Sequence, residues 1–278
     1  MPGRIPPPSP DIPQDGNPYA AIASRSPGRI GCDIRYFEQV DSTQRVAAEL
    51  AQKGIAQGAV VIADSQLAGR GRLGRSWHSP AGVNLYMTVI LRPRMSLPEV
   101  PRLSLVAGVA VAEALEMTAP GLVALKWPND IWLSRRKAGG IIAEAMTDSS
   151  SGPICVLLGI GLNLNLAADD IPPELRDKAT SVLATTGRQV DRIQLAGQLF
   201  NLLDMHYKAV QRDGFAAVRS LYEHYFALDG QQVTVVDGNS KISGLVRGID
   251  PDGALILETR AGAVRILTGD VSLEGAYD

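Results

Sequence analysis

The stretch from Gln66 to Asn84 constrains this chain more than any other. It reads Q-L-A-G-R-G-R-L-G-R-S-W-H-S-P-A-G-V-N, with three glycines and three arginines alternating over residues 69–75. Glycine has no Cβ and tolerates positive φ, so the backbone can wrap closely around a ligand. Arginine presents a planar fork of donors that fits phosphate or carboxylate oxygens. A solvated basic hairpin tip is the alternative. We favour a mobile lid that closes over phosphates.

Hydrophobic periodicity and turn signals predict an α+β fold around this lid. We expect a mixed β-sheet with helices packed on one side, followed by a small β domain. After Asp229, four or five short apolar runs are joined by Asp-Gly turns, which indicate hairpins. The predicted strands are residues 34–40, 59–63, 84–91, 122–125, 131–133, 138–145 and 154–166, and the predicted helices are 45–53, part of 97–117, 191–212 and 214–226.

Composition divides the chain into three parts. Residues 1–32 hold eight of the 18 prolines and show no periodicity, so we expect a disordered tail. Residues 33–227 form the predicted main domain, and residues 228–278 the β domain. The formal net charge is −2, which gives no overall attraction to nucleic acid. Two cysteines are too few for a metal cage, and we find neither a long apolar run nor a signal peptide. We therefore expect a cytoplasmic protein.

A polar triplet, Asp41-Ser42-Thr43, stands where the first predicted strand meets the first predicted helix. At such a junction, hydroxyls and backbone N–H groups point into the space beyond the strand end, where anions and polar ligands bind. A plain helix N-cap explains Asp41 or Ser42 equally well.

The second informative motif is K-W-P-N-D at residues 126–130. Pro128 fixes φ and removes a hydrogen-bond donor, so the preceding strand must stop there. Lys126 then occupies the last position of a strand, and a rigid element directs its ammonium group. A turn with a surface lysine is the alternative on this motif alone. The presence of this motif and the glycine–arginine stretch in the same chain favours a binding site.

Other patterns are weaker. The basic pair before Gly139-Gly140 is either a phosphate contact or a hairpin turn, and we favour the turn. Residues 159–163, G-I-G-L-N, lack the third glycine of a dinucleotide fingerprint and lie within a strand, which excludes a Rossmann site. Asp130 and Glu144 could help to hold Mg²⁺, although their spacing does not establish it.

Taken together, these motifs resemble those of the biotin–protein ligases, in the form without an N-terminal DNA-binding domain. The likeness covers about Asp33 to Leu273, and the C-terminal β module looks like the SH3-like domain of that family. It implies the class II synthetase-like catalytic fold of biotin and lipoate ligases. The motifs that carry it are D-S-T-Q (41–44), G-R-G-R-L-G-R (69–75), K-W-P-N-D (126–130), R-K-A-G-G-I-I-A-E (136–144) and G-I-G-L-N (159–163).

The resemblance implies a two-step reaction. Biotin and Mg-ATP would give biotinyl-5′-adenylate and pyrophosphate, and the biotinyl group would then pass to a lysine of a biotin carboxyl carrier domain of a carboxylase. Lys126 and Arg72 would be catalytic, with Lys126 contacting the biotin carboxylate and the α-phosphate. Gln44 departs from the asparagine that is more usual in the family. The implied substrate site comprises Ser42, Thr43, Gln44, Gln66, Arg70, Gly71, Arg72 and Lys126, supported by Gly69, Gly74, Arg75, Trp77, Asp130, Lys137, Gly139 and Asn163.

Two other functions fit the same sequence features. One is a lipoate or octanoate ligase of the same superfamily, and the other is a ligand-sensing protein without turnover. Residues 1–32 are too short and too rich in proline for a helix-turn-helix, so we expect no DNA binding. We also expect no membrane association and either a monomer or a homodimer.

Overall fold

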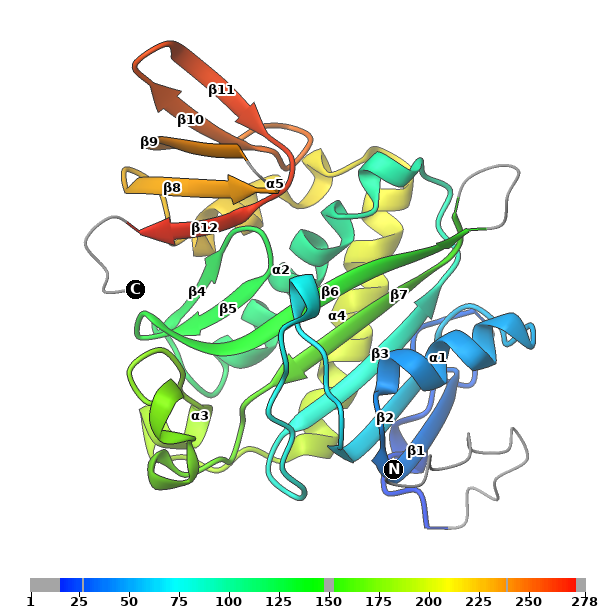
Figure 1. The fold of residues 1–278 in the computed structure, drawn as a ribbon. Helices are drawn as coiled ribbons and strands as arrows, with labels where there is room; N and C mark the ends of the chain where they lie inside the picture. Colours follow the sequence, from blue (N-terminus) through cyan, green and yellow to red (C-terminus); the bar gives the residue numbers. More distant parts are fainter. Residues whose placement is uncertain (1–15, 27, 148–152, 239, 274–278) are drawn as a thin grey trace, which may run out of the picture.

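A computed structural model describes residues 16–26, 28–147, 153–238 and 240–273. Within them, one mixed sheet has the strand order β1-β2-β3-β7-β6-β5-β4, and a second sheet has the order β11-β10-β9-β8-β12 (Figure 1). The strands of the first sheet are β1 Asp33–Val40, β2 Ala59–Gln66, β3 Leu85–Leu91, β4 Val123–Lys126, β5 Asp130–Leu133, β6 Arg136–Thr147 and β7 Pro153–Leu162. The helices are α1 Thr43–Gln52, α2 Arg102–Glu116, α3 Val182–Thr186, α4 Arg192–Asp213 and α5 Ala216–Tyr225. The second sheet contains β8 Gln232–Asp237, β9 Ser240–Ile249, β10 Leu255–Thr259, β11 Gly262–Ile266 and β12 Asp270–Leu273.

The first sheet is buried on both faces at β2. Val60 and Ile62 belong to the main core with α2 and α4, whereas the alternate residue Val61 packs in a smaller core with α1. Successive side chains of a strand point to opposite faces, so this alternation places α1 on the face opposite α2 and α4. The predicted mixed sheet with helices is therefore confirmed, with α1 as the helix on the second face.

Helix α1 covers only part of that second face. The connection between β2 and β3, which contains the glycine–arginine stretch, crosses the front of β6 and β7 beside α1 (Figure 1). The fold thus leaves an open area of sheet between α1 and the second sheet, and the stretch lies over it.

The tail that we predicted to be disordered is folded in part. Residues 1–15 lie outside the described residues, but Tyr19 and Ile30 are only 3% and 4% exposed and belong to the main core. The Asn17 side chain donates a hydrogen bond to the backbone oxygen of Ile34 in β1. The prediction failed here because a few apolar residues, widely spaced among prolines and glycines, give no periodic signal.

The second sheet confirms the predicted β domain and adds one strand, β12, which pairs with β8. The two sheets are joined by direct contacts beside the K-W-P-N-D motif. The Trp127 indole N–H donates to the backbone oxygen of Gly253 at 3.0 Å, and Arg102 forms an ion pair with Asp252 at 3.2 Å. In the described part of the chain, we find no helix long and apolar enough to cross a membrane.

Candidate functional site

The glycine–arginine stretch is a narrow hairpin. Arg70 and Ser76 form an antiparallel bridge, and the Gly71 N–H donates to the Arg75 oxygen at 2.6 Å. A Cβ on Gly69 would stand 2.6 Å from the backbone oxygen of Trp77, so only glycine allows this approach of the two arms. At the tip, Leu73 has a φ of 56° and is 74% exposed.

The first of two hollows lies between this hairpin and the N-terminus of α1. The Gln66 side-chain oxygen accepts hydrogen bonds from the Thr43 N–H at 2.9 Å and the Thr43 hydroxyl at 3.2 Å, and the Gln66 amide donates to Ser79. Ser42 makes no side-chain capping bond. The polar triplet is therefore organised by Gln66 from β2 and is more than a simple N-cap. The lining residues are Ser42, Thr43, Gln44, Gln66, Arg70, Gly71, Arg72, Trp77, Tyr86, Met87, Asn129, Lys137, Gly140, Ile141, Ile142, Glu144, Gly159, Ile160 and Gly161.

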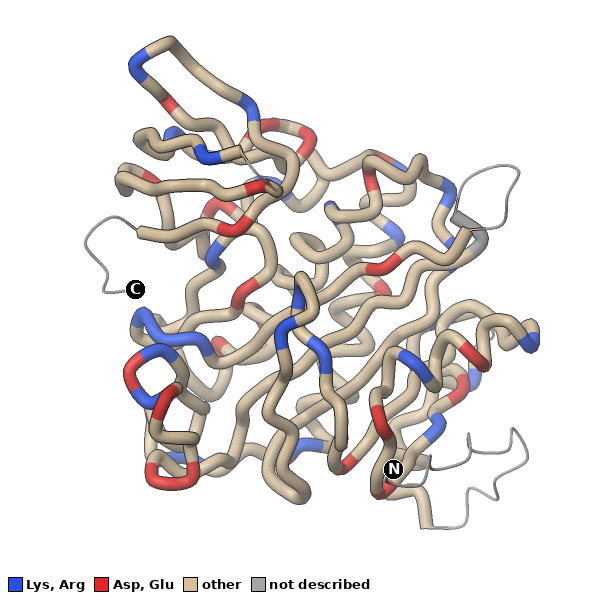
Figure 2. The backbone as a smooth tube through the Cα atoms, viewed as in Figure 1, with Lys and Arg blue, Asp and Glu red and all other residues tan. Residues whose placement is uncertain are grey.

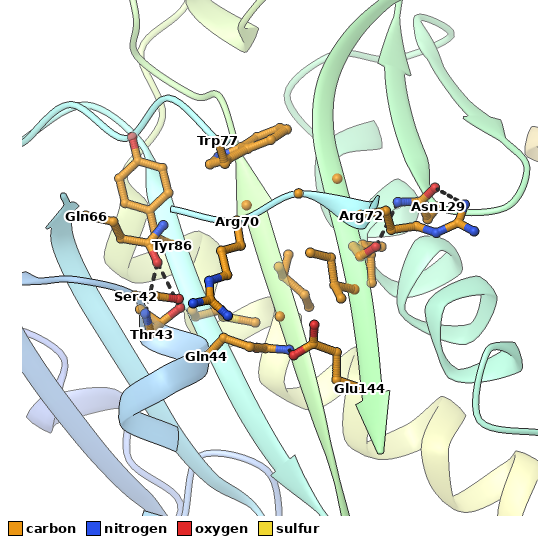
Figure 3. A pocket seen from close by; sticks show the side chains of 18 of the residues that line it. Ser42, Thr43, Gln44, Gln66, Arg70, Arg72, Trp77, Tyr86, Asn129 and Glu144 are labelled. Atoms are coloured by element: carbon orange, nitrogen blue, oxygen red, sulfur yellow. Dashed lines mark hydrogen bonds between the residues drawn. The ribbon is translucent and has the colours of Figure 1, made fainter. Parts of the chain in front are cut away.

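Gln44 closes the far end of this hollow. Its side-chain oxygen accepts from the Thr88 hydroxyl at 2.9 Å, and its amide donates to Glu144 and to the backbone oxygen of Leu157, each at 3.2 Å. Protein groups thus engage both polar atoms of this amide. Glu144, which we considered for Mg²⁺, lies here beside Gln44 (Figure 3).

Three glycines of β6 and β7 form the floor of the first hollow. A Cβ on Gly159 would stand 2.8 Å from the Gln44 side chain, and a Cβ on Gly161 would stand 2.7 Å from the indole nitrogen of Trp77. Gly140 is less crowded, at 3.3 Å from the same ring. The Trp77 indole N–H is buried and has no partner among the described residues. The Trp77 ring therefore lies directly on a side-chain-free floor and carries an unused donor.

Arg70 and Arg72 point to opposite ends of the site. Figure 3 shows Arg70 directed into the first hollow toward Thr43 and Gln44, whereas Arg72 extends the other way to Asn129. The Arg72 guanidinium donates to the Asn129 side-chain oxygen at 3.4 Å and to the backbone oxygen of Gly269 at 3.3 Å.

The second hollow has a volume of about 330 Å³ and lies between the hairpin, the K-W-P-N-D motif and β12. The two hollows adjoin, because five residues line both of them: Gly71, Arg72, Trp77, Asn129 and Lys137. The other lining residues are Arg75, Ser76, His78, Lys126, Trp127, Pro128, Asp130, Asn163, Leu166, Ile171, Pro172, Leu175, Lys178, Ala179, Asp270, Val271 and Ser272.

Three lysines line the second hollow, and two of them, Lys126 and Lys137, lie in different settings. Lys126 lies at the end of β4, with its ammonium 5.5 Å from the centre of the Trp132 ring. Burial lowers the pKa of Lys126, and the nearby carboxylate of Asp130 opposes that shift. Lys137, at the start of β6, forms an ion pair with Asp130 at 2.5 Å and lies 5.5 Å from the Trp77 ring. Of the two, Lys137 is the lysine that borders both hollows.

Asp270 of β12 brings a carboxylate into the second hollow. It forms ion pairs with Arg75 and, at 3.9 Å, with Arg72. In this structure Arg72 and Arg75 of the hairpin are therefore held by the second sheet. In the part of the chain that the structure describes, no group of three or more His, Cys, Asp or Glu side chains could hold a metal ion.

Most of the predicted site residues meet at these hollows. Three do not line either one: Gly69 and Gly74 shape the hairpin, and Gly139 packs against Leu162, 2.7 Å from where its Cβ would be. The predicted site did not include the floor glycines Gly140, Gly159 and Gly161. Alternate residues of a strand face the same side, so Gly159 and Gly161 could have been predicted to share one face. The predicted site also did not include Asp270, whose short strand gave no functional signal.

Two family models match this chain. The model described as "Biotin/lipoate A/B protein ligase family" matches residues 36–163, and "Biotin protein ligase C terminal domain" matches residues 230–274.

Individual relatives extend the match to most of the chain. The bifunctional ligase/repressor BirA of Bacillus spizizenii is 36% identical over 244 residues, which cover 88% of this chain and 75% of the relative. The biotin–[acetyl-CoA-carboxylase] ligase of Paracoccus denitrificans is 34% identical over 242 residues, 85% of this chain and 99% of the relative. The solved structure of a biotin protein ligase from Aquifex aeolicus in complex with biotin and ATP matches with a TM-score of 0.75 and 31% identity, covering 87% of this chain and 98% of that one.

Proposed function

This chain belongs to the biotin/lipoate A/B protein ligase family, and we propose that its two adjoining hollows hold biotin and ATP side by side. The chain is an ATP-dependent biotin–protein ligase. The observation that carries the proposal is the shared wall between the hollows, where Arg72, Trp77 and Lys137 meet. A carboxylate in one hollow and a phosphate in the other would approach each other at that wall.

We assign biotin to the first hollow. Gln44 and the Trp77 ring both rest on its glycine floor, and the flat space between them suits a fused ring system. Thr43, Gln66 and Arg70 supply polar groups at one end for the ureido ring. The carboxylate tail would then extend to the junction with the second hollow. Gln44, whose amide is fully engaged by protein groups, acts as the end wall.

We assign ATP to the second hollow and propose Lys137 for the joint contact with the biotin carboxylate and the α-phosphate, because it borders both spaces. Lys126, to which the sequence led us to give this role, lines only the second hollow, and we propose that it contacts the nucleotide. A biotin carboxylate oxygen attacks the α-phosphorus and pyrophosphate leaves. Fixed cations stabilise the charge that builds on these oxygens, and removing one such group typically costs roughly 10²–10³ in rate.

We propose that Mg²⁺ accompanies ATP, since Mg²⁺ in nucleotide sites is usually held by substrate phosphates and one or two carboxylates. Asp130 lines the second hollow and forms an ion pair with Lys137, so it is a candidate carboxylate for this ion. The residues present therefore fit a phosphate-bound Mg²⁺ better than a cage built by the protein alone.

The second step transfers the biotinyl group to a lysine of a carrier domain, which we infer to be the biotin carboxyl carrier domain of a carboxylase. The acceptor amine needs placement and loss of a proton, so no covalent enzyme intermediate is required. The mixed anhydride is sensitive to water, and a closed hairpin over the junction would protect it until the acceptor arrives.

The test is incubation with biotin, Mg-ATP and an isolated carrier domain, scored by the mass of the acceptor. We expect a mass increase of one biotinyl group that requires ATP. Parallel reactions with lipoate or octanoate test the related ligases: pyrophosphate exchange that responds to lipoate and not to biotin would contradict our assignment. Biotin binding without any acceptor labelling would instead support a ligand-sensing protein.

We further propose that the protein acts in the cytoplasm, as a monomer or homodimer, and does not bind DNA. Residues 16–26 and 28–32 contain one short 3-10 turn, Ala20–Ile22, and loops, so these described residues form no helix-turn-helix. Sequence-specific retention on operator DNA in a gel shift would overturn this proposal.

A further inference from the structure

The turn between β5 and β6 has a conformation that its sequence does not favour. Ser134 and Arg135 both have positive φ, 48° and 66°, and the flanking Leu133 and Arg136 are paired across the hairpin. Such two-residue turns prefer Asn, Asp or Gly, because a left-handed conformation costs other residues roughly 1–2 kcal/mol each. An arginine at the second position therefore costs stability, and this indicates that its side chain is used.

Three cations gather at this turn, and we call them the β5–β6 basic cluster: Arg135, Arg136 and Lys178. Arg135 and Lys178 are exposed and Arg136 is half-buried. None of the three forms an ion pair within the described residues, although Asp177 is adjacent to Lys178 in the chain. In Figure 2 the β5–β6 turn stands out as a run of blue with further blue in the neighbouring loop.

The cluster borders the reaction site. The Lys137 N–H donates to the backbone oxygen of Lys178 at 2.9 Å, which fixes the two segments side by side. Lys178 lines the second hollow, and Lys137 lines both hollows. Arg135 stands in the turn, two residues before Lys137 in the chain. Any protein that reaches the adenylate from this side must pass these cations.

We propose that the β5–β6 basic cluster is the docking surface for an acidic face of the acceptor domain. This inference rests on the proposed function, because only the transfer step needs a macromolecule at the mouth of the site. Complementary charge at the rim of an interface speeds encounter and orients the partner. Three cations on a chain with a net charge of −2 fit a small acidic protein surface better than nucleic acid, whose binding depends on many phosphate contacts.

The experiment separates the two steps of the reaction in the full-length protein. Biotin-dependent pyrophosphate exchange reports adenylate formation, and acceptor labelling at increasing acceptor concentration reports transfer. We expect the double variant Arg135→Glu, Arg136→Glu to keep pyrophosphate exchange within about twofold. At low salt, its kcat/KM for the acceptor should fall at least about tenfold, and this difference from wild type should shrink as salt rises.

Two matched variants complete the design. Arg135→Gly removes the cation and also relieves the positive φ, so it should raise the melting temperature while lowering kcat/KM for the acceptor two- to fivefold, the size of one exposed charge contact. Lys53→Glu reverses one cation at the exposed C-terminal end of α1, on the opposite side of the molecule in Figure 1, and should transfer like wild type.

The outcomes are distinct. Unchanged acceptor kinetics in both Arg135 variants at low salt would overturn the docking surface. So would an equal loss of pyrophosphate exchange and transfer, which would place the cluster in the nucleotide site. A wild-type protein without any biotin-dependent exchange would instead contradict the proposed function itself.

Discussion

The substitution Gly161→Ala tests whether the floor of the first hollow positions Trp77. The added Cβ would lie 2.7 Å from the Trp77 indole nitrogen and 2.9 and 3.2 Å from two other ring atoms. Ordinary contacts begin at 3.4 Å, so the ring must rise by about 0.7 Å. Trp77 belongs to the hairpin and not to either hydrophobic core, so the ring and hairpin can shift while both cores keep their packing.

Overpacking of this kind typically costs about 1–3 kcal/mol. If this free energy is lost from ligand binding, the Kd for biotin rises roughly 5- to 150-fold, because each 1.4 kcal/mol is a factor of ten. Isothermal titration with biotin measures the change, and thermal unfolding should shift by only a few degrees. Gly140→Ala is the control, since its Cβ would meet the same ring at 3.3 Å and should cost less than Gly161→Ala. Equal affinities in both variants and wild type would refute a positioning role for this floor.

Three further predictions follow from the charged groups. Lys137→Met should lower the rate of pyrophosphate exchange roughly 10²–10³-fold and raise KM for both biotin and ATP. Lys126→Met should raise KM for ATP alone. Steady-state kinetics of both variants decide which lysine makes the joint contact. Asp270→Asn removes an anion from the second hollow and should lower KM for ATP by up to about fivefold, and a higher KM would show that Asp270 positions Arg72 instead. Burial lowers the pKa of Lys126 in the folded state. As the pH approaches the ordinary lysine pKa of 10.5, the unfolded chain therefore binds more protons than the folded chain. The contribution of Lys126 to the free energy of unfolding consequently rises with pH in that range. Urea unfolding at several alkaline pH values should show this contribution in wild type and not in Lys126→Met.

Local patterns in the sequence were sufficient for much of the architecture. The long apolar helix, the paired Asp-Gly turns and the alternation around the glycine–arginine stretch predicted elements that the structure confirms, because each depends on neighbours in the chain. The five-residue helix α3 escaped prediction, since a single turn carries no periodicity.

The site was harder to predict where it depends on contacts between distant segments. The sequence predicted that Lys137 belongs to a turn. In the structure it is the second residue of β6, it lines both hollows, and residues 178–180 pair beside it. Gln44 lines the first hollow, as predicted for a ligand contact, and the sequence did not reveal that Thr88, Glu144 and Leu157 engage its amide. No local pattern marked Asp270 as a site residue, because its ion pairs with Arg72 and Arg75 depend on the contact between β12 and the hairpin.

The bond between the hairpin and β12 has a consequence for how an active molecule is produced. During synthesis the main sheet and the first hollow can form as soon as β7 and the following helices have left the ribosome. Arg72 finds Gly269 and Asp270 only after the small sheet has folded and docked. A nascent or C-terminally clipped chain would therefore lack the contacts that hold Arg72 and Arg75 at the second hollow.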